Sequence, residues 1–413
     1  MNSEKLQWSR IVRGFSEGRA LSIFHYSIIP LFQYSSIPMK ILMLNYEFPP
    51  IGGGAAQAHL CLLQQYANVQ GLYVDVLTSA PKPGAVKEKL AENITIYKVG
   101  LHKKHLHFWR KVEVLEWLIK AKFCYRKLIR ENDYDLVHAF FGFPTGWLCY
   151  RSAKRLPYII SLRGSDVPGQ NVRLQLDYKI LAPVFRAIWR NAAALVACSG
   201  GLKDRALRFL PSVPIEVIPN GVDLSRFQPV ETRDGRDGLR LLTVGRLSLT
   251  KRVEMLIDAV EILRRDGCNL SFTIAGGGQL EQGLRDLVRQ KKLDEMIAVA
   301  GRIDPEDVPQ MYRCSDIFIS ASMQEGMSNA MLEAMASGLP IVATRCEGVE
   351  ELVTDNGIIV EQSSAEAIAG AIRKLAEDRL LRKQMAIAAR KQAERFTWSG
   401  IAKEYLALYE RVT

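Results

Sequence analysis

Short apolar runs alternate with stretches of helical periodicity along most of the chain. In the first half the runs are rich in β-branched and aromatic residues and fall at 40–45, 72–77, 94–99, 135–139, 157–162, 193–198 and 215–218. In the second half they fall at 239–244, 269–275, 296–300, 316–320, 339–343 and 357–360. Apolar strands separated by helices are typical of parallel sheets covered by helices on both faces. The pattern therefore predicts an α/β protein with doubly wound sheets.

Two loop-like segments interrupt this alternation near the middle of the chain. They are the turn Pro219-Asn220-Gly221 and the polar stretch 231–238. We therefore expect one Rossmann-like domain over 39–219 and a second over 220–397, facing each other across a cleft, because ligands bind such sheets at the carboxyl ends of their strands. The chain is expected to end in two helices, near 364–394 and 398–412. The last helix is predicted to pack back on the first domain.

Residues 1–38 differ in pattern from the rest of the chain. The apolar stretch 20–38 is interrupted by His25, Gln33 and two prolines, and it has no small-residue cleavage site. Neither a spanning helix nor a signal peptide is predicted. Because Met39 opens the first strand, we interpret 1–38 as an N-terminal extension that is non-native or disordered.

Composition narrows the class of protein. Apolar residues make up 48% and charged residues 24%, a balance typical of globular proteins. The seven cysteines are scattered and form no Cys-x-x-Cys pair, which favours reduced thiols in the cytoplasm and predicts no metal site. The net charge of +11 indicates an anionic partner: nucleic acid, a lipid surface or a phosphorylated substrate. No nucleic-acid recognition motif accompanies the charge, so nucleic acid is not predicted as a partner.

The segment from Glu325 to Glu333 is the first candidate for chemistry. It leaves a predicted strand through Gly326-Met327-Ser328-Asn329 and enters a helix. Free amides at a helix start favour a phosphate. Glu325 precedes the predicted helix and Glu333 lies about one turn inside it, so the two carboxylates would lie at different depths along one ligand. One could accept hydrogen bonds from sugar hydroxyls and the other from ribose hydroxyls. Taken alone, the pair could equally be a surface residue and a helix salt bridge.

Two cations in another predicted strand-to-helix loop support a binding role for this pair of glutamates. Arg246 and Lys251 stand five residues apart between a strand and a helix. Cations normally avoid a helix amino terminus, because the helix dipole repels them, so a bound anion would explain why these two lie there. A diphosphate fits, since the planar guanidinium of Arg246 and the ammonium of Lys251 could hold it together. Two solvated surface charges are the alternative.

Two glycine-rich loops also follow strands. Gly52, Gly53 and Gly54 would let backbone amides approach a phosphate closely, although a tight turn without a ligand gives the same pattern. Ala275-Gly276-Gly277-Gly278 lacks the third glycine spacing of a dinucleotide fingerprint, so a nicotinamide-dependent oxidoreductase is not favoured.

Together these segments resemble the retaining glycosyltransferases of family 4, which have the GT-B fold. The resemblance runs from about Met39 to the end and includes Ile218-Pro219-Asn220-Gly221-Val222-Asp223, Val244-Gly245-Arg246 with Lys251, and the run from Glu325 to Pro340. It implies a metal-independent hexosyltransferase whose co-substrate is a UDP- or GDP-sugar and which needs no further cofactor. The acceptor would be a lipid-linked, polysaccharide or other glycan, in cell-envelope or exopolysaccharide synthesis.

The resemblance also implies a role for each matching residue. Arg246 and Lys251 would hold the donor diphosphate and, with Glu325, form the catalytic set. Glu325 would bind the transferred sugar, Glu333 the ribose, and the backbone near Arg302 the base. The loop Gly52 to Gly54 would close on the phosphates, and the residues Gly326, Met327, Ser328 and Asn329 would complete the donor site.

One position departs from the family pattern. Relatives often carry a His where this chain has Arg163, so that role does not transfer. Arg163 is a candidate for contact with a phosphate or an acidic acceptor, and an ion pair with Asp166 is the alternative. Arg163, Asp166 and His138 are the acceptor-side candidates.

A basic amphipathic segment covers residues 103–130. Its apolar residues recur at helical spacing: Phe108, Val112, Leu115, Ile119 and Phe123. Such a helix can lie on an anionic membrane, which predicts a peripheral protein at the inner membrane face. The alternative is an ordinary helix whose apolar stripe packs on the sheet. For the whole chain, a sugar-nucleotide epimerase or isomerase with the same cleft is the alternative function.

Overall fold

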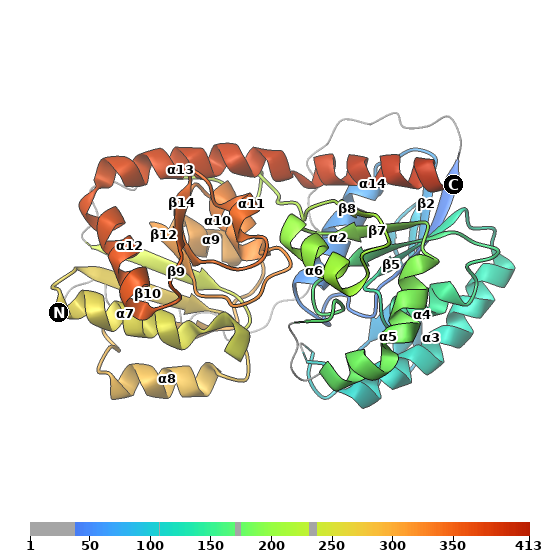
Figure 1. Cartoon of the computed structure of the whole chain (residues 1–413), viewed down its shortest axis with the longest axis horizontal. Helices are drawn as coiled ribbons and strands as arrows, with labels where there is room; N and C mark the ends of the chain where they lie inside the picture. Colours follow the sequence, from blue (N-terminus) through green and yellow to red (C-terminus); the bar gives the residue numbers. More distant parts are fainter. Residues whose placement is uncertain (1–37, 107, 170–174, 231–237) are drawn as a thin grey trace.

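The computed structural model describes residues 38–106, 108–169, 175–230 and 238–413. The predicted extension 1–38 lies outside the described residues except for Pro38, as does nearly all of the polar stretch 231–238. In the described part of the chain, two α/β units lie side by side along the longest axis of the molecule (Figure 1).

The first unit is built on an eight-stranded sheet with the order β3-β4-β2-β1-β5-β6-β7-β8. Its strands are β1 (Met39–Leu44), β2 (Leu72–Ala80), β3 (Ala85–Ala91), β4 (Ile94–Gly100), β5 (Leu136–Phe140), β6 (Tyr158–Leu162), β7 (Ala194–Ala197) and β8 (Ile215–Val217). Its helices are α2 (Gly54–Tyr66), α3 (Lys111–Glu131), α4 (Thr145–Tyr150), α5 (Gln175–Arg190) and α6 (Gly200–Phe209). All described pairs are parallel except β3 with β4.

The second unit is built on a parallel six-stranded sheet with the order β11-β10-β9-β12-β13-β14. Its strands are β9 (Leu239–Val244), β10 (Leu270–Ala275), β11 (Ile297–Gly301), β12 (Ile317–Ser320), β13 (Ile341–Thr344) and β14 (Gly357–Val360). Its helical segments are η2 (Leu249–Lys251), α7 (Val253–Arg265), α8 (Glu281–Gln290), α9 (Val308–Arg313), α10 (Asn329–Ala336), α11 (Val349–Leu352) and α12 (Ala365–Glu377).

The fold class predicted from the apolar pattern is therefore confirmed, with two differences. The pattern did not predict β3, because this edge strand is largely exposed and has no apolar core face. The helix expected over 364–394 is two helices, α12 and α13 (Arg379–Ala393). Asp378 separates them and caps α13, where its carboxylate accepts a hydrogen bond from the Leu381 N–H.

The chain crosses between the two units at two places that lie beside one another. After β8, Val222 pairs with Thr397, and the Val222 N–H donates to the Phe396 carbonyl at 2.6 Å. A short turn, η3 (Glu394–Phe396), joins α13 to α14 (Trp398–Val412), and the two helices run along the top of both units (Figure 1).

Helix α14 packs on the first sheet through buried tyrosines. The Tyr409 hydroxyl lies 2.7 Å from His138 Nδ1 and accepts a hydrogen bond from the Tyr66 hydroxyl at 3.0 Å, and Tyr405 lies 2.9 Å from Ser161 Oγ. The last helix therefore ties the end of the chain to the first unit. Within the described residues, no helix is both long and apolar enough to cross a bilayer.

Candidate active site

The candidate residues gather where the strand order of each sheet reverses. In the first sheet β1 lies between β2 and β5, and the glycine loop follows β1. In the second sheet β9 lies between β10 and β12, and the loops after β9 and β12 carry Arg246, Lys251 and Glu325. Doubly wound sheets bind ligands at such reversal points. A cavity of about 890 Å³ lies between the two units and is lined by residues from all three loops.

The loop that carries Arg246 is held by the loop after β10. A Cβ at Gly276 would lie 1.8 Å from the carbonyl oxygen of Gly245, and one at Gly278 would lie 2.2 Å from that of Leu247. The Leu247 N–H also donates to the Gly277 carbonyl at 3.0 Å. The glycines after β10 therefore allow two backbones to touch, and that contact fixes the backbone on either side of Arg246.

Lys251 forms an ion pair with Glu325 across the reversal point of the second sheet. The lysine side chain is 25% exposed and the glutamate side chain 13%, so both are largely buried but still accessible to solvent. The lysine ends η2 and the glutamate follows β12, which explains how residues 74 positions apart meet. The sequence placed both in one site, and the structure brings them into contact.

Glu333 lies one turn inside α10 and also lines the cavity. Its Oε2 accepts a hydrogen bond from the Tyr312 hydroxyl at 2.8 Å. Burial raises the pKa of the Glu333 carboxyl from 4.5 to about 7, although the Tyr312 hydrogen bond and the Arg226 charge both lower it. A partly protonated carboxyl that faces a cavity is a frequent feature of functional sites.

The segment between Glu325 and α10 contacts the first unit. A Cβ at Gly326 would lie 3.1 Å from both the Arg163 carbonyl oxygen and Cys198 Sγ, so this position allows close approach of the two units. Ser328 is the N-cap of α10, where its hydroxyl accepts from the Met331 N–H at 3.4 Å. The cap leaves the start of α10 directed at the cavity, which Met327, Ser328 and Asn329 line.

The glycine loop faces these residues from the first unit. Gly52 has a φ of +99°, a conformation that favours glycine. A Cβ at Gly53 would lie 2.6 Å from Arg246 Nη2, so the guanidinium reaches across the cleft to the loop backbone. Gly54 opens α2, and its carbonyl accepts a hydrogen bond from Asn329 Nδ2 at 3.2 Å.

A chain of hydrogen bonds joins the two units along the cavity. Arg163 Nη1 donates to Asn220 Oδ1 at 2.8 Å, and Asn220 Nδ2 donates to Asn329 Oδ1 at 2.8 Å. Beyond the cavity Arg205 pairs with Glu347 at 3.0 Å, and the Gly200 N–H donates to Glu351 at 2.6 Å. These contacts describe a closed arrangement of the cleft.

The acceptor-side candidates have different surroundings. Arg163 and Asp166 line the cavity. Asp166 accepts hydrogen bonds from the backbone N–H groups of Arg163, at 2.8 Å, and Gly142, at 2.7 Å. The Arg163 guanidinium instead lies 4.2 Å from the centre of the Phe140 ring. The Asp166 carboxylate therefore contacts the backbone of Arg163 and not its guanidinium, so the alternative of a side-chain ion pair between them is not observed.

His138 is not among the residues that line the cavity. It is fully buried, and its Nε2 lies 2.7 Å from Ser161 Oγ while Nδ1 faces Tyr409. Burial, with smaller contributions from Arg163 and His59, holds its pKa well below 6.5, which keeps the ring neutral. This geometry gives His138 a role in holding α14 on the sheet and offers no ring atom to an acceptor.

Arg302 follows β11 and is exposed, outside the cavity lining. It lies beside Gly277, where a Cβ would be 3.6 Å from the Arg302 Cβ.

The sequence pattern did not identify Glu47, which follows β1 and lines the cavity. Burial raises the pKa of its carboxyl above the usual value, although the Arg246 charge lowers it in part. The pattern also did not identify Asn220 as a cross-cleft contact, because Pro219-Asn220-Gly221 has the composition of an ordinary turn.

Comparison with known proteins identifies both units. Residues 52–226 match the family described as Glycosyltransferase Family 4, and residues 228–392 match the one described as Glycosyl transferases group 1. Mannosylfructose-phosphate synthase of Agrobacterium fabrum is 31% identical to the chain over 412 residues, which cover 88% of each protein.

Solved structures share the whole arrangement. Sucrose-phosphate synthase from Thermosynechococcus elongatus has a TM-score of 0.77 at 20% identity, over 91% of this chain and 99% of that one. HepE of Anabaena, in complex with UDP and glucose, has a TM-score of 0.69 at 18% identity, over 90% of this chain and 100% of that one. On these similarities, the chain belongs to glycosyltransferase family 4 and has the GT-B fold.

Proposed function

We propose that this glycosyltransferase moves a hexose or N-acetylhexosamine, with retention of anomeric configuration, from a nucleotide-diphosphate sugar to a glycan, polysaccharide or lipid-linked acceptor. The observation that carries the proposal is the placement of Arg246, Lys251 and Glu325 around one cavity, opposite the glycine loop. Three charged groups from two loops meet where a doubly wound sheet binds its ligand.

The diphosphate binds Arg246 and Lys251 in this proposal. Lys251 is paired with Glu325 in the ligand-free protein, and a phosphate has more charge than a carboxylate to offer the ammonium. Binding then draws Lys251 toward the phosphate and frees Glu325 to accept hydrogen bonds from hydroxyls of the sugar. The amides at the start of α10 provide further donors to the anion.

The ribose binds Glu333, eight positions after Glu325 and one turn inside α10. The Tyr312 hydroxyl, which does not line the cavity, donates to one oxygen of its carboxyl group, and in this proposal the other oxygen accepts from ribose hydroxyls. UDP is the first choice of nucleotide because a structural neighbour, HepE, holds UDP, and GDP is the alternative. The base would lie toward the backbone near Arg302, past the loop after β10.

Arg246 and Lys251 assist departure of the leaving group. As the bond between the sugar carbon and the phosphate oxygen breaks, negative charge grows on the diphosphate, and two fixed cations stabilise it more than they stabilise the ground state. The acceptor oxygen forms the new bond on the same face of the sugar, and the departing phosphate takes the acceptor proton. No protein nucleophile enters this scheme.

The acceptor approaches from the first unit. Arg163 and Asp166 line this side of the cavity, and Arg163 is the positively charged member of the two. Arg163 is therefore our candidate for contact with an anionic group of the acceptor.

The seven cysteines are all unpaired, which supports a reducing, cytoplasmic location for the protein and a reaction of cell-envelope or exopolysaccharide synthesis.

A donor-consumption assay tests the transfer. Purified protein is incubated with UDP-sugars and GDP-sugars, with and without an oligosaccharide or lipid-linked acceptor, and both nucleoside diphosphate release and the product anomer are followed by NMR. We expect acceptor-dependent release and an unchanged anomeric configuration. Conversion of one nucleotide sugar into another without acceptor would instead establish the epimerase or isomerase alternative.

A further inference from the structure

Helix α3 has two apolar faces, and only one of them packs on the domain. Its inner face is buried through Trp117, Ala121, Tyr125 and Leu128. The side chains of the outer face follow one another at helical spacing and are 62%, 56%, 51% and 66% exposed: Val112, Leu115, Ile119 and Phe123. Four of the five residues of the apolar stripe that the sequence indicated are therefore exposed, and the alternative, that this stripe packs on the sheet, is wrong for them. Four large exposed apolar residues on one helix face indicate a contact surface.

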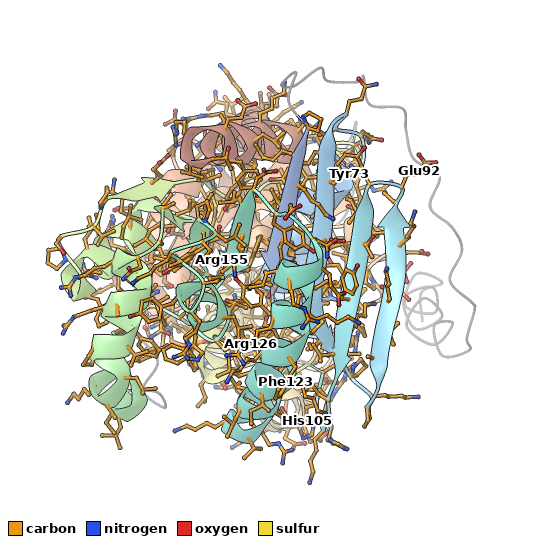
Figure 2. All side chains as sticks on the ribbon, turned by 90° about the vertical axis from the view of Figure 1, so that its right-hand side faces the viewer. Tyr73, Glu92, His105, Phe123, Arg126 and Arg155 are labelled. Carbon is orange, nitrogen blue, oxygen red and sulfur yellow. The ribbon has the colours of Figure 1, made fainter. Side chains whose placement is uncertain are left out.

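Cations flank this outer face. The exposed ones, spaced to lie beside the stripe, are Lys122, Arg126, Lys127 and Arg130. Figure 2 shows Phe123 and Arg126 together on the outward side of α3. The face thus combines apolar and positively charged side chains, as interfacial helices do.

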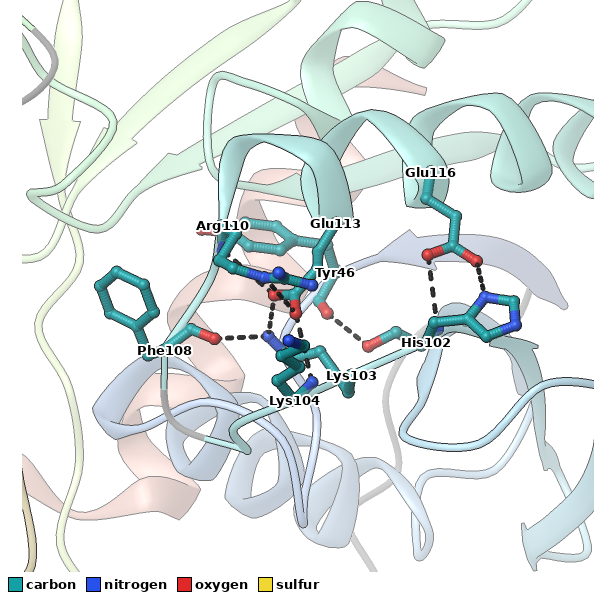
Figure 3. Close-up of polar contacts among 9 residues, drawn as sticks. Tyr46, His102, Lys103, Lys104, Phe108, Arg110, Glu113 and Glu116 are labelled. Carbon is teal, nitrogen blue, oxygen red and sulfur yellow. Dashed lines mark hydrogen bonds and ion pairs between the residues drawn. The ribbon is translucent and has the colours of Figure 1, made fainter.

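Two of the three acids of α3 are engaged at the start of the helix (Figure 3). The third, Glu131, pairs with Arg130 at 3.5 Å, so the acids of the helix leave Lys122, Arg126 and Lys127 unneutralised. Glu113 is buried and accepts from Lys103 Nζ at 2.9 Å and from Arg110 Nε at 3.1 Å. Burial alone would raise the Glu113 pKa, but the hydrogen bonds from Arg110, Lys103 and Lys104 lower it to about 2. Glu116 accepts from Lys120 at 2.6 Å.

This cluster also corrects the extent of the predicted segment. The helix begins at Lys111, whereas the sequence indicated a basic helix from residue 103. Lys103 is buried against Glu113 and lies 3.8 Å from the centre of the Trp109 ring. It therefore fastens the segment before α3 to the domain and is not part of the exposed basic face.

The outer face is continuous with the acceptor side of the cavity. The cavity wall includes Leu115 and Leu118 of α3, together with Leu181 and Phe185 of α5. Next to that wall α5 exposes two further apolar side chains, Leu176 at 69% and Ile180 at 67%. Helices α3, α4 and α5 lie together on one side of the first unit (Figure 1). An apolar wall thus leads from the site of transfer to the exposed apolar surface.

We propose that the outer face of α3, with Leu176 and Ile180 of α5, docks on an anionic lipid bilayer and presents the cavity to a lipid-linked acceptor. The occupant is a bilayer because the surface pairs apolar side chains with cations, which match an acyl boundary and anionic headgroups. The acceptor class rests on the proposed transferase function; the docking surface itself does not.

Vesicle flotation of the full chain tests the surface. The vesicles are phosphatidylcholine alone or phosphatidylcholine mixed with phosphatidylglycerol, at low and high salt. One variant removes apolar contacts outside the cavity lining, I119S/F123S/I180S, and a second reverses charge, K122E/R126E. The matched control, L380S/I387S, changes side chains of α13 that are 68% and 67% exposed, on the other unit. The UDP-induced thermal shift of each protein reports folding and the donor site.

We expect wild type and control to bind the anionic vesicles, with binding that weakens in salt, and each α3 variant to bind at least ~10-fold more weakly with an unchanged UDP shift. Equal binding to neutral vesicles, or α3 variants that bind like wild type, would overturn the docking surface. A UDP shift without vesicle binding would overturn it too and leave the donor site standing. A dimer in gel filtration that I119S/F123S/I180S dissociates, without vesicle binding, would show that a second copy covers this face.

Discussion

Replacing Glu333 with Gln should make the protein more stable and its nucleotide binding weaker. Burial raises the pKa of this carboxyl from 4.5 to about 7, so the folded state holds the proton more tightly than the unfolded chain does. The contribution of Glu333 to stability is therefore most favourable below about pH 4.5, declines as the pH rises to about 7, and is constant above that. Gln keeps an acceptor for the Tyr312 hydroxyl and carries no charge.

The magnitude follows from the size of the shift. A difference of about 2.5 pKa units corresponds to at most about 3 kcal/mol, and the partial exposure of Glu333 toward the cavity reduces it to about 1–3 kcal/mol. For a domain of this size each kcal/mol moves Tm by about 2–4 °C. Glu333→Gln should then melt several degrees above wild type at about pH 8 and close to wild type at about pH 4.5.

The assay is thermal unfolding of both proteins across this pH range, with and without UDP. Glu377→Gln, which changes an exposed carboxyl at the end of α12, is the control. UDP should bind Glu333→Gln about tenfold more weakly, because hydrogen bonds to a charged acceptor are worth about 1.5–3 kcal/mol. A difference in Tm that does not change with pH, together with unaltered UDP binding, would refute the assignment of Glu333 to the ribose.

Further predictions concern the contacts across the cleft. Gly53→Ala places a methyl group against Arg246 Nη2 and should lower kcat/KM about 10- to 100-fold. Gly54→Ala is the control and should be nearly neutral, because the nearest neighbour of its methyl group would be 3.5 Å away. Equal losses of kcat/KM in steady-state assays would contradict the packing of Arg246 on the loop. Asn220→Ala removes hydrogen bonds to Arg163 and Asn329 and should raise the KM for the donor about fivefold, with little change in Tm. An unaltered KM would show that the closed arrangement of the cleft does not assist donor binding.

The parallel sheets were predictable from sequence because their buried strands are continuous apolar runs. Strand β1, for example, is buried over Ile41–Leu44 and reads Met-Lys-Ile-Leu-Met-Leu. Strand β3 was not predictable, since its Lys and Glu residues face solvent and only pairing with β4 defines it. The division of the terminal helical stretch depends on a single cap, Asp378, whose effect a periodic pattern does not show.

Much of the candidate site was also predictable, for a different reason. Arg246, Lys251, Glu325 and Glu333 stand just after strands or at helix starts, and reversal of strand order brings such positions together. What sequence could not give is the pairing between units. Neither the bond from Asn220 to Asn329 nor the burial of His138 under α14 has a local signal, because each depends on chain segments that are more than 100 residues apart. The orientation of α3 was open for a similar reason, since both of its faces carry apolar residues.

The central claim is that a nucleoside diphosphate binds between Arg246 and Lys251 in the cleft, and calorimetric titration of UDP and GDP tests it most directly. The proteins compared are wild type, Arg246→Ala, Lys251→Ala and Lys374→Ala, the last an exposed lysine of α12 as control. The account predicts that wild type and Lys374→Ala bind at least one of the nucleotides, and that loss of either cleft cation weakens binding at least ~10-fold, because each provides charge-assisted hydrogen bonds. Equal affinity in all four proteins would contradict it.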